Sequence, residues 1–193
     1  HLKPKIQLKH LSTRFWFFLV IVFVFTLGNS ADALLLVKTA ETGINKSLIP
    51  FVYMIFNSVS VLLAIPVGKI SDKKGREIFI IIGFIIYAIL YFLFGKYNSL
   101  NVFLFLFALY GVYSAFVDGC QKALISDIVH KDMIGTSYGL YHAVLGITLL
   151  PASLIAGLLY DHVNSNAPFY FGALMAVIAT VLMIIYTIVY KNK

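Results

Sequence analysis

The chain has 193 residues, of which 61% are hydrophobic and 12% are charged, and its formal net charge is +7. A soluble domain is about half apolar and about a quarter charged, so this composition excludes an ordinary soluble domain and indicates a protein with several membrane spans. The basic residues gather at the ends of apolar runs, which favours membrane topology over nucleic-acid binding as their role. The single cysteine, Cys120, excludes an intrachain disulfide and a Cys-pair zinc site.

Six apolar runs follow a basic leader at residues 1–14 and precede a short tail at residues 191–193. Each run has about 18 to 26 residues, the length that a helix needs to cross the hydrocarbon layer. The alternating pattern of a β-barrel does not occur, so we predict an all-α membrane domain over residues 15–190. The predicted spans are Phe15–Val37, Leu48–Val67, Ile78–Gly95, Leu100–Ala123, Gly135–Tyr160 and Pro168–Tyr190.

The first run has one alternative interpretation. Ala31-Asp32-Ala33 has the small-x-small form of a signal-peptide cleavage site. The apolar run continues past that point and is longer than the apolar region of a signal peptide, and five more runs follow. We therefore predict that it is retained as a membrane helix.

The distribution of lysine and arginine predicts the orientation of the spans. With the N-terminus inside, the connecting segments and ends carry 12 basic residues on the inner side and 3 on the outer side, which predicts that both termini are cytoplasmic. The inner residues are Lys3, Lys5, Lys9, Arg14, Lys69, Lys73, Lys74, Arg76, Lys122, Lys131, Lys191 and Lys193, and the outer ones are Lys38, Lys46 and Lys96.

A basic, glycine-bounded stretch, Gly68–Arg76, separates the second and third predicted spans. It resembles the Gly-x-x-x-Asp-x-x-Gly-Arg loop signature of the major facilitator superfamily of secondary transporters. The residues at the signature positions are Gly68, Asp72, Gly75 and Arg76. The resemblance implies a gating loop in which Asp72 interacts with Arg76 or with a neighbouring helix end, and Asp127 is a further candidate partner.

The same resemblance implies an architecture and a function. Six spans with both ends inside look like half of a twelve-helix transporter, built from two inverted three-helix repeats. The basic leader looks like the end of the central loop, which would make this the C-terminal half, with the N-terminal half as its partner. The expected function is movement of a small solute across the cell membrane by alternating access, with proton coupling as one alternative. The superfamily lines its cavity with the first and fourth spans, and we expect the third and sixth to be outermost.

Ionisable residues within the spans are the first candidates for solute or proton sites. Asp32 lies near the outer end of the first span, and Asn29 and Thr26 fall on the same face of a continuous helix. This pattern favours a cavity-lining carboxylate. The alternative is that Asp32 is an interfacial residue close to Lys38.

The fourth span carries Tyr110, Ser114, Asp118 and Lys122 at intervals of four, hence on one helical face. Asp118 and Lys122 are spaced to pair, either as a functional site or because Lys122 reaches the inner headgroups and Asp118 neutralises it. His142, in the fifth span, is a candidate proton relay with Asp118, or else a structural hydrogen-bond donor. In the second span, Tyr53, Asn57 and Ser60 more closely fit interhelical hydrogen bonds than solute ligands.

Two other classes of function remain as alternatives. A non-transporting membrane scaffold or assembly subunit could share this topology, although embedded charges would then be costly without a purpose. An intramembrane enzyme is not expected, because the chain has no His-Glu-x-x-His, no Gly-x-Ser-x-Gly and no paired metal ligands. No cofactor or nucleic-acid partner is expected.

Overall fold

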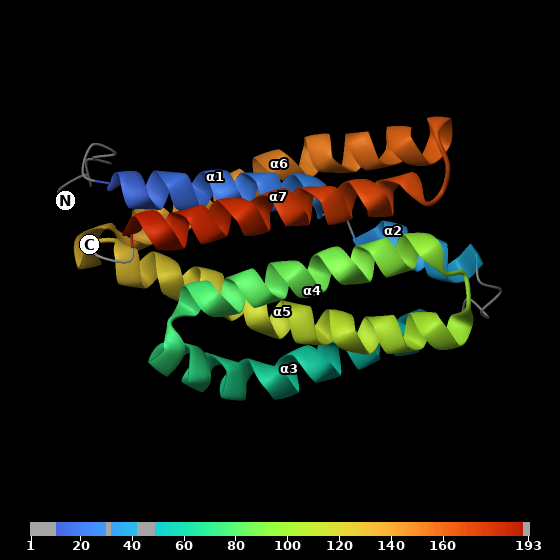
Figure 1. Ribbon diagram of the computed structural model, residues 1–193, viewed down its shortest axis with the longest axis horizontal. Helices are drawn as coiled ribbons and strands as arrows, with labels where there is room; N and C mark the ends of the chain where they lie inside the picture. The colour runs from blue at the N-terminus through green and yellow to red at the C-terminus, as the bar shows by residue number, and fades with distance from the viewer. Residues whose placement is uncertain (1–10, 30–31, 42–48, 191–193) are drawn as a thin grey trace, which may run out of the picture.

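The computed structural model describes residues 11–29, 32–41 and 49–190, and gives the backbone alone for residues 32, 33 and 41. Within these ranges the regular structure is helical throughout, and Figure 1 shows the long helices lying side by side along the length of the molecule. The α-helices are α1 (Thr13–Gly28), α2 (Asp32–Glu41), α3 (Ile49–Lys74), α4 (Arg76–Lys96), α5 (Leu100–Ile128), α6 (Ile134–His162) and α7 (Ala167–Tyr190). A short 3-10 helix, η3 (Lys131–Met133), connects α5 to α6.

Five of the described helices, α3 to α7, are long and apolar enough to cross a membrane. They correspond to the second to sixth predicted spans, which confirms a multi-span helical membrane protein. The first predicted span, residues 15–37, is wrong as one continuous helix, because the structure divides it into α1 of 16 residues and the separate helix α2. Thr26 belongs to α1 and Asp32 to α2, so the single helical face expected for Asn29, Thr26 and Asp32 does not rest on one continuous helix.

The end of α1 has a local physical cause. Asn29 leaves the helical conformation, and its N–H bonds to the carbonyl oxygens of Phe25 and Thr26 at 3.1 Å. Tyr87 of α4 donates its hydroxyl to the carbonyl oxygen of Gly28 at 3.1 Å, so this helix-end acceptor is satisfied inside the protein. Glycine also has a low helix propensity, which lowers the cost of a break at Gly28.

Two predicted loops are also corrected. The stretch from Gly68 to Lys74 is not a loop, because α3 continues through it and the chain turns at Gly75 alone, with φ of 93°. Glycine suits this left-handed conformation, and lysines in the last turn of α3 interact favourably with the helix dipole. The loop predicted to begin at Lys38 is likewise helical through Glu41, and Lys38 is 1% exposed, with its ammonium donating to Ser165 Oγ at 3.1 Å.

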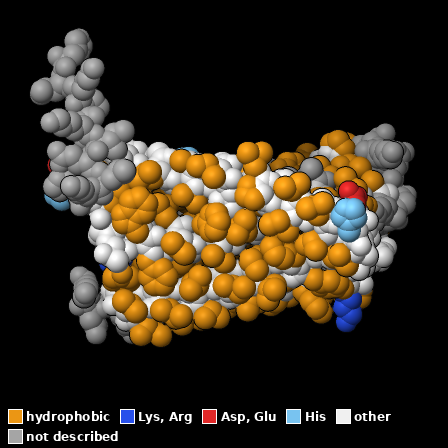
Figure 2. All heavy atoms as spheres, turned by 90° about the horizontal axis from the view of Figure 1, so that it is seen from above, with side chains coloured by type: hydrophobic (Ala, Val, Ile, Leu, Met, Phe, Trp, Pro, Cys, Tyr) orange, Lys and Arg blue, Asp and Glu red, His pale blue; other side chains and the backbone are white. Residues whose placement is uncertain are grey.

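The long helices pack in the order α3, α5, α4, α7, α1, α6, which can be followed from bottom to top in Figure 1. Helices that are distant in sequence are therefore neighbours, as α1 is to α7. Figure 2 shows hydrophobic side chains along the length of one face of the bundle, with the charged side chains close to its ends. We call the end of the bundle where α3 meets α4 the Arg76 end, and the opposite one the Lys38 end.

An aromatic core joins α1, α4 and α5. The rings of Phe25 and Phe84 stack at 4.1 Å, and those of Tyr87 and Tyr91 stack at 4.0 Å. Tyr113 meets Tyr87 edge to face at 4.9 Å. Each such pair contributes about 0.5–1.5 kcal/mol beyond its area burial, so the core holds the three helices at a defined spacing.

Glycines allow the helices to cross closely. A Cβ on Gly111 of α5 would lie 2.5 Å from the carbonyl oxygen of Phe56 on α3, and one on Gly172 of α7 would lie 2.6 Å from that of Gly28. In a membrane, helices associate through close packing more than through the hydrophobic effect, so these crossings matter for stability.

We expect Gly111→Ala to lower the melting temperature of the purified chain in detergent by about 3–10 °C, from about 1–3 kcal/mol of overpacking. Alanine favours a helix by about 1 kcal/mol over glycine, but the rigid backbone of Phe56 must move to admit the methyl group. Gly146→Ala is the matched control, because a Cβ there meets nothing within 4 Å. An equal melting temperature for the two variants would contradict the close α3–α5 crossing.

Candidate functional site

The exposed side chains of the spanning helices fall into two kinds. Apart from Lys96 at the end of α4, the exposed residues of α4 and α7 are apolar, which suits contact with lipid. The exposed surface of α3, α5 and α6 also has many apolar side chains, but it contains polar and charged side chains within the spans as well. They include Asn57, Ser58, Asp118, Lys122 and His142. Because polar groups at membrane depth face a protein interior or a watery cavity, the candidate site lies on α3, α5 and α6.

A pocket of about 240 Å³ lies between α3 and α5 in the half of the bundle nearer the Arg76 end. Its lining residues are Ser60, Ala64, Gly68, Ser71, Arg76, Ser114, Ala115, Asp118, Gly119, Cys120 and Ala123. Small side chains dominate this list, which is why two helices in contact still leave open volume. The pocket joins an embedded carboxylate, three serines and the signature arginine in one space.

A chain of hydroxyl groups ends at the carboxylate in this pocket. Ser60 of α3 donates to Ser114 Oγ of α5 at 3.1 Å, and Ser114 donates to Asp118 Oδ2 at 2.5 Å. Asp118 is exposed and lies ten residues before the end of α5 at Ile128, which is about 15 Å at 1.5 Å per residue. The interhelical bond of Ser60 is therefore confirmed, and the carboxylate presents hydrogen-bonded oxygen atoms that suit a proton or a cation.

Arg76 links three helices at its end of the bundle. Its Nη1 pairs with Asp72 Oδ1 at 2.7 Å, and its Nε donates to Asp127 Oδ2 at 2.5 Å. The contact between Asp72 and Arg76 is one that the signature resemblance implied, whereas Asp127, a candidate partner for Asp72, pairs with Arg76 instead. The turn at Gly75 places Arg76 on α4 beside the last turns of α3 and α5. Both carboxylates are more than half exposed, so the two ion pairs together contribute about 1 kcal/mol.

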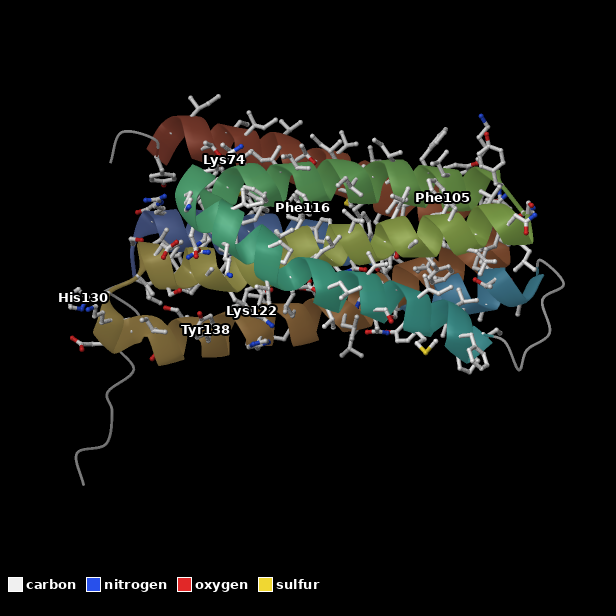
Figure 3. The ribbon with its side chains drawn as sticks, turned by 90° about the horizontal axis from the view of Figure 1, so that it is seen from below. Lys74, Phe105, Phe116, Lys122, His130 and Tyr138 are labelled. Atoms are coloured by element: carbon white, nitrogen blue, oxygen red, sulfur yellow. The ribbon has the colours of Figure 1, made fainter. Side chains whose placement is uncertain are left out.

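Two tyrosines of α6 bond to α5 near the same end. Tyr138 donates its hydroxyl to the main-chain carbonyl oxygen of Lys122 at 2.9 Å, and Figure 3 shows both residues on the side of the bundle seen from below. Tyr141 donates to Gln121 Oε1 at 2.7 Å, and both of these side chains are buried. The contacts between α5 and α6 therefore include specific polar bonds that a sliding or rocking motion would have to break.

The other predicted site residues have more varied surroundings. Tyr110 is 3% exposed and packs against Phe56, Tyr91 and Tyr113, so it belongs to the aromatic core. Asn29 Oδ1 accepts from the Tyr87 hydroxyl at 3.4 Å, beside the break after α1.

Three expectations about these residues stay predictions. Asp32 is the first residue of α2, and its side chain lies outside the described residues. His142 is exposed, with its ring 5.1 Å from that of Tyr141, and its relay with Asp118 is not tested. The same holds for the pairing of Asp118 with Lys122.

Sequence reasoning missed two features that the packing creates. Cys120 is 2% exposed and lines the same pocket as Asp118, which a lone cysteine in an apolar run does not reveal. Arg14 Nη2 pairs with Glu77 Oε1 at 3.0 Å, and its Nε donates to the Tyr186 hydroxyl at 2.9 Å. The positive charge of Arg14 was a visible signal, but its partners are 63 and 172 residues away along the chain.

In the part of the chain that the structure describes, no group of three or more His, Cys, Asp or Glu residues is placed to hold a metal ion.

The family model of the Major Facilitator Superfamily matches residues 15–192, which is nearly the whole chain. The chain belongs to the major facilitator superfamily. It is therefore a multi-pass membrane protein of a transporter family, and the resemblance drawn from Gly68, Asp72, Gly75 and Arg76 is confirmed.

Individual relatives agree with this assignment. The chain is 34% identical over 189 residues to an uncharacterised MFS-type transporter, MJ1317, of Methanocaldococcus jannaschii, covering 93% of this chain and 46% of that protein. It is 29% identical to Multidrug resistance protein 1 of Bacillus subtilis, over 66% of this chain and 33% of that protein. It is 24% identical to the Quinolone resistance protein NorA of Staphylococcus aureus, over 61% of this chain and 30% of NorA. The chain thus spans less than half the length of these relatives.

Proposed function

We propose that this chain is the C-terminal six-helix half of a secondary transporter that moves a small solute by alternating access. The observation that carries the proposal is the contrast between the apolar exposed face of α4 and α7 and the polar pocket of α3 and α5. A polar-lined surface within the spans fits a half that encloses a solute path together with a second half. A scaffold would gain nothing from Asp118 at this depth, so the scaffold alternative is not favoured.

The order of helix packing supports two inverted three-helix repeats. Inverted repeats would make α1 equivalent to α5, α3 equivalent to α6, and α4 equivalent to α7. Under this equivalence, the α3–α5 contact corresponds to the α6–α1 contact, and the α5–α4 contact corresponds to the α1–α7 contact. The central α4–α7 contact corresponds to itself. The equivalence counts α1 together with α2 as the first span, giving six. On this reading, α4 and α7 lie on the side of the bundle away from the partner half and present their apolar face to lipid.

The proposed mechanism assigns different roles to the two polar clusters. Asp118 binds a proton or a cationic group of the solute, and its charge then differs between conformations. Arg76, with Asp72 and Asp127, holds α3, α4 and α5 together in one conformation and releases them in the other. We call these two ion pairs of Arg76 the latch. With the Arg76 end on the cytoplasmic side, as the lysine distribution predicts, the latch is closed on that side in the described conformation.

Asn29 and Asp32 flank the break between α1 and α2, and we propose that they belong to the solute path on the outer side. Transporters often form solute sites where a spanning helix is interrupted, because the interruption frees backbone groups in a cavity. The break after Gly28 supports this placement.

The full-length transporter in proteoliposomes, with an imposed pH gradient, tests the proposed function. We expect accumulation of a solute that depends on the gradient and collapses when a protonophore is added. The names of two relatives suggest a quinolone and a panel of organic cations as the first probes. Binding of these probes without transport in any gradient would contradict the secondary-transport proposal.

A further inference from the structure

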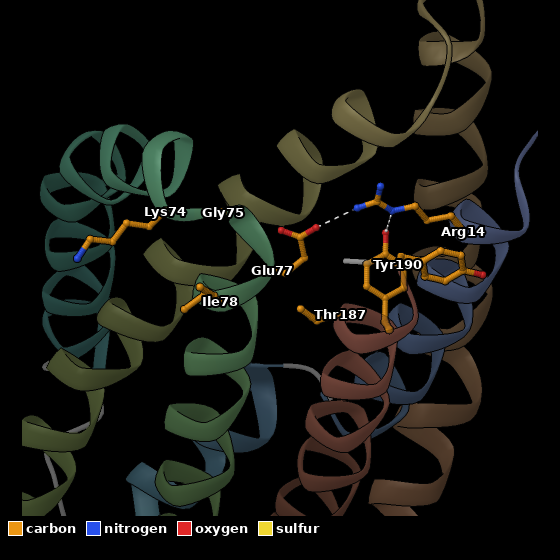
Figure 4. Close-up of a pocket in the computed structure, with 8 residues that line it drawn as sticks. Arg14, Lys74, Gly75, Glu77, Ile78, Thr187 and Tyr190 are labelled. Atoms are coloured by element: carbon orange, nitrogen blue, oxygen red, sulfur yellow. Dashed lines mark hydrogen bonds and ion pairs between the residues drawn. The ribbon is translucent and has the colours of Figure 1, made fainter. Parts of the chain in front are cut away.

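A second pocket, of about 340 Å³, lies at the Arg76 end between α1, α4 and α7, away from the candidate solute site (Figure 4). Its lining residues are Arg14, Lys74, Gly75, Glu77, Ile78, Tyr186, Thr187 and Tyr190. The pocket lies at the Arg76 end of the apolar exposed surface of α4 and α7, beside the first turn of α4 and the last turn of α7. The proposed transport cycle does not use it.

The groups in this pocket leave it with a positive charge. Arg14 is paired with Glu77 at 3.0 Å, and its guanidinium lies 5.6 Å and 5.9 Å from the ring centres of Tyr186 and Tyr190. The lining contains two cations, Arg14 and Lys74, and one carboxylate, Glu77, so it carries a net charge of +1. Since Arg14 neutralises Glu77, the excess charge belongs to Lys74, an exposed lysine that lines one side of the pocket and whose ammonium points away from Arg14 in Figure 4. The tyrosine and threonine side chains add hydroxyl groups.

An apolar surface extends from this pocket along α4. Ile78, Ile82, Ile85 and Ile89 are exposed at helical spacing on one face, and Val181, Ile184 and Ile188 are exposed on the adjacent α7. Near the Lys38 end, the two helices form a shallow apolar pocket of about 550 Å³. Its lining residues are Ala88, Ile89, Phe92, Tyr170, Ala173, Leu174 and Val177. A ligand that fits both regions has an anionic head and a long apolar tail.

We propose that the groove between α4 and α7 binds an anionic phospholipid, with its phosphodiester beside Lys74 and Arg14 and an acyl chain along the isoleucines of α4. Basic pockets between spanning helices commonly hold the headgroups of anionic lipids. A net charge of −1 and a hydroxyl-bearing headgroup, as in phosphatidylglycerol, complement the +1 charge and the hydroxyls of the lining. A choline headgroup would bring a third cation close to Lys74 and Arg14. This inference is independent of the transport proposal.

The test is a titration of the purified protein in neutral detergent with phosphatidylglycerol, phosphatidylcholine, phosphatidylethanolamine and soluble glycerol phosphate, followed by the melting temperature. We expect phosphatidylglycerol to raise the melting temperature with saturation. We expect Lys74→Gln to weaken this binding by about fivefold, the effect of one lysine near an anionic headgroup. Lys74 is exposed and lies at a helix end, so the variant should fold.

Lys96→Gln is the matched control, because Lys96 is an exposed lysine at the Lys38 end of the bundle, in the last turn of α4 and above the Tyr97 ring. It should bind phosphatidylglycerol as the wild type does. Equal weakening by the two substitutions would overturn the proposed headgroup position. Equal stabilisation by either zwitterionic lipid would overturn the selectivity for an anionic lipid, and full stabilisation by glycerol phosphate would overturn the role of the acyl chain.

Discussion

Asp118→Asn is expected to lower pH-gradient-driven uptake by the full-length transporter by about tenfold or more. The carboxylate receives the Ser114 hydroxyl at 2.5 Å, and a hydrogen bond to a charged group contributes about 1.5–3 kcal/mol. A change of about 1.4 kcal/mol corresponds to a factor of ten in rate. Asparagine keeps the size of the side chain and can still accept the Ser114 hydroxyl, but it loses the charge that strengthens this bond and it cannot titrate. Counterflow in the absence of a gradient should therefore be less affected than gradient-driven uptake.

Asp132→Asn is the matched control for this experiment. Asp132 is 89% exposed in the 3-10 helix between α5 and α6, where its contact with His130 is 3.4 Å. The two substitutions remove the same charge from the same end of the bundle, and only the first lies within a spanning helix. Wild-type uptake by the Asp118 variant, or equal losses in both variants, would show that the pocket between α3 and α5 is not a coupling site.

Arg76→Gln is expected to raise the rate of alkylation of Cys120 by about fivefold, since loss of about 1 kcal/mol of ion pairing changes an equilibrium by about that factor. Arg76 bonds to Asp72 and Asp127 and so connects the ends of three helices. Cys120 is 2% exposed and lines the pocket beside Arg76, so its reaction with a maleimide reports opening between α3 and α5. The variant should remain in the membrane, because the long apolar helices are unchanged.

Lys69→Gln removes a neighbouring exposed cation and serves as the control for that measurement. It should leave the alkylation rate at the wild-type value. If Arg76→Gln also leaves the rate unchanged, the ion pairs do not hold the two helices together, and the latch assigned to Arg76 is wrong. The readout uses a thiol rather than transport, so it separates a conformational effect from a loss of solute binding.

The sequence by itself determined the class of the protein and the position of five spans. Long apolar runs that end in lysine and arginine have one stable arrangement in a membrane, because the backbone of each run must satisfy its own hydrogen bonds. The spacing of Gly68, Asp72, Gly75 and Arg76 was enough to identify the superfamily. The spacing of Ser114 and Asp118 was enough to predict that they share a face. These features are local, so a pattern within a few helical turns contains them.

The tertiary structure alone decided the features that depend on neighbouring helices. The break after Gly28 depends on the Tyr87 hydroxyl of α4, and the pocket at Asp118 depends on Ser60 and the small residues of α3. Lys38 was expected in a loop, but Ser165 and the surrounding packing bury it on α2. Arg14 meets Tyr186 across 172 residues of sequence. Apolar runs are nearly uniform around their helices, so the sequence predicts that a span exists but not which of its faces meets protein, lipid or a pocket; close packing between helices sets that.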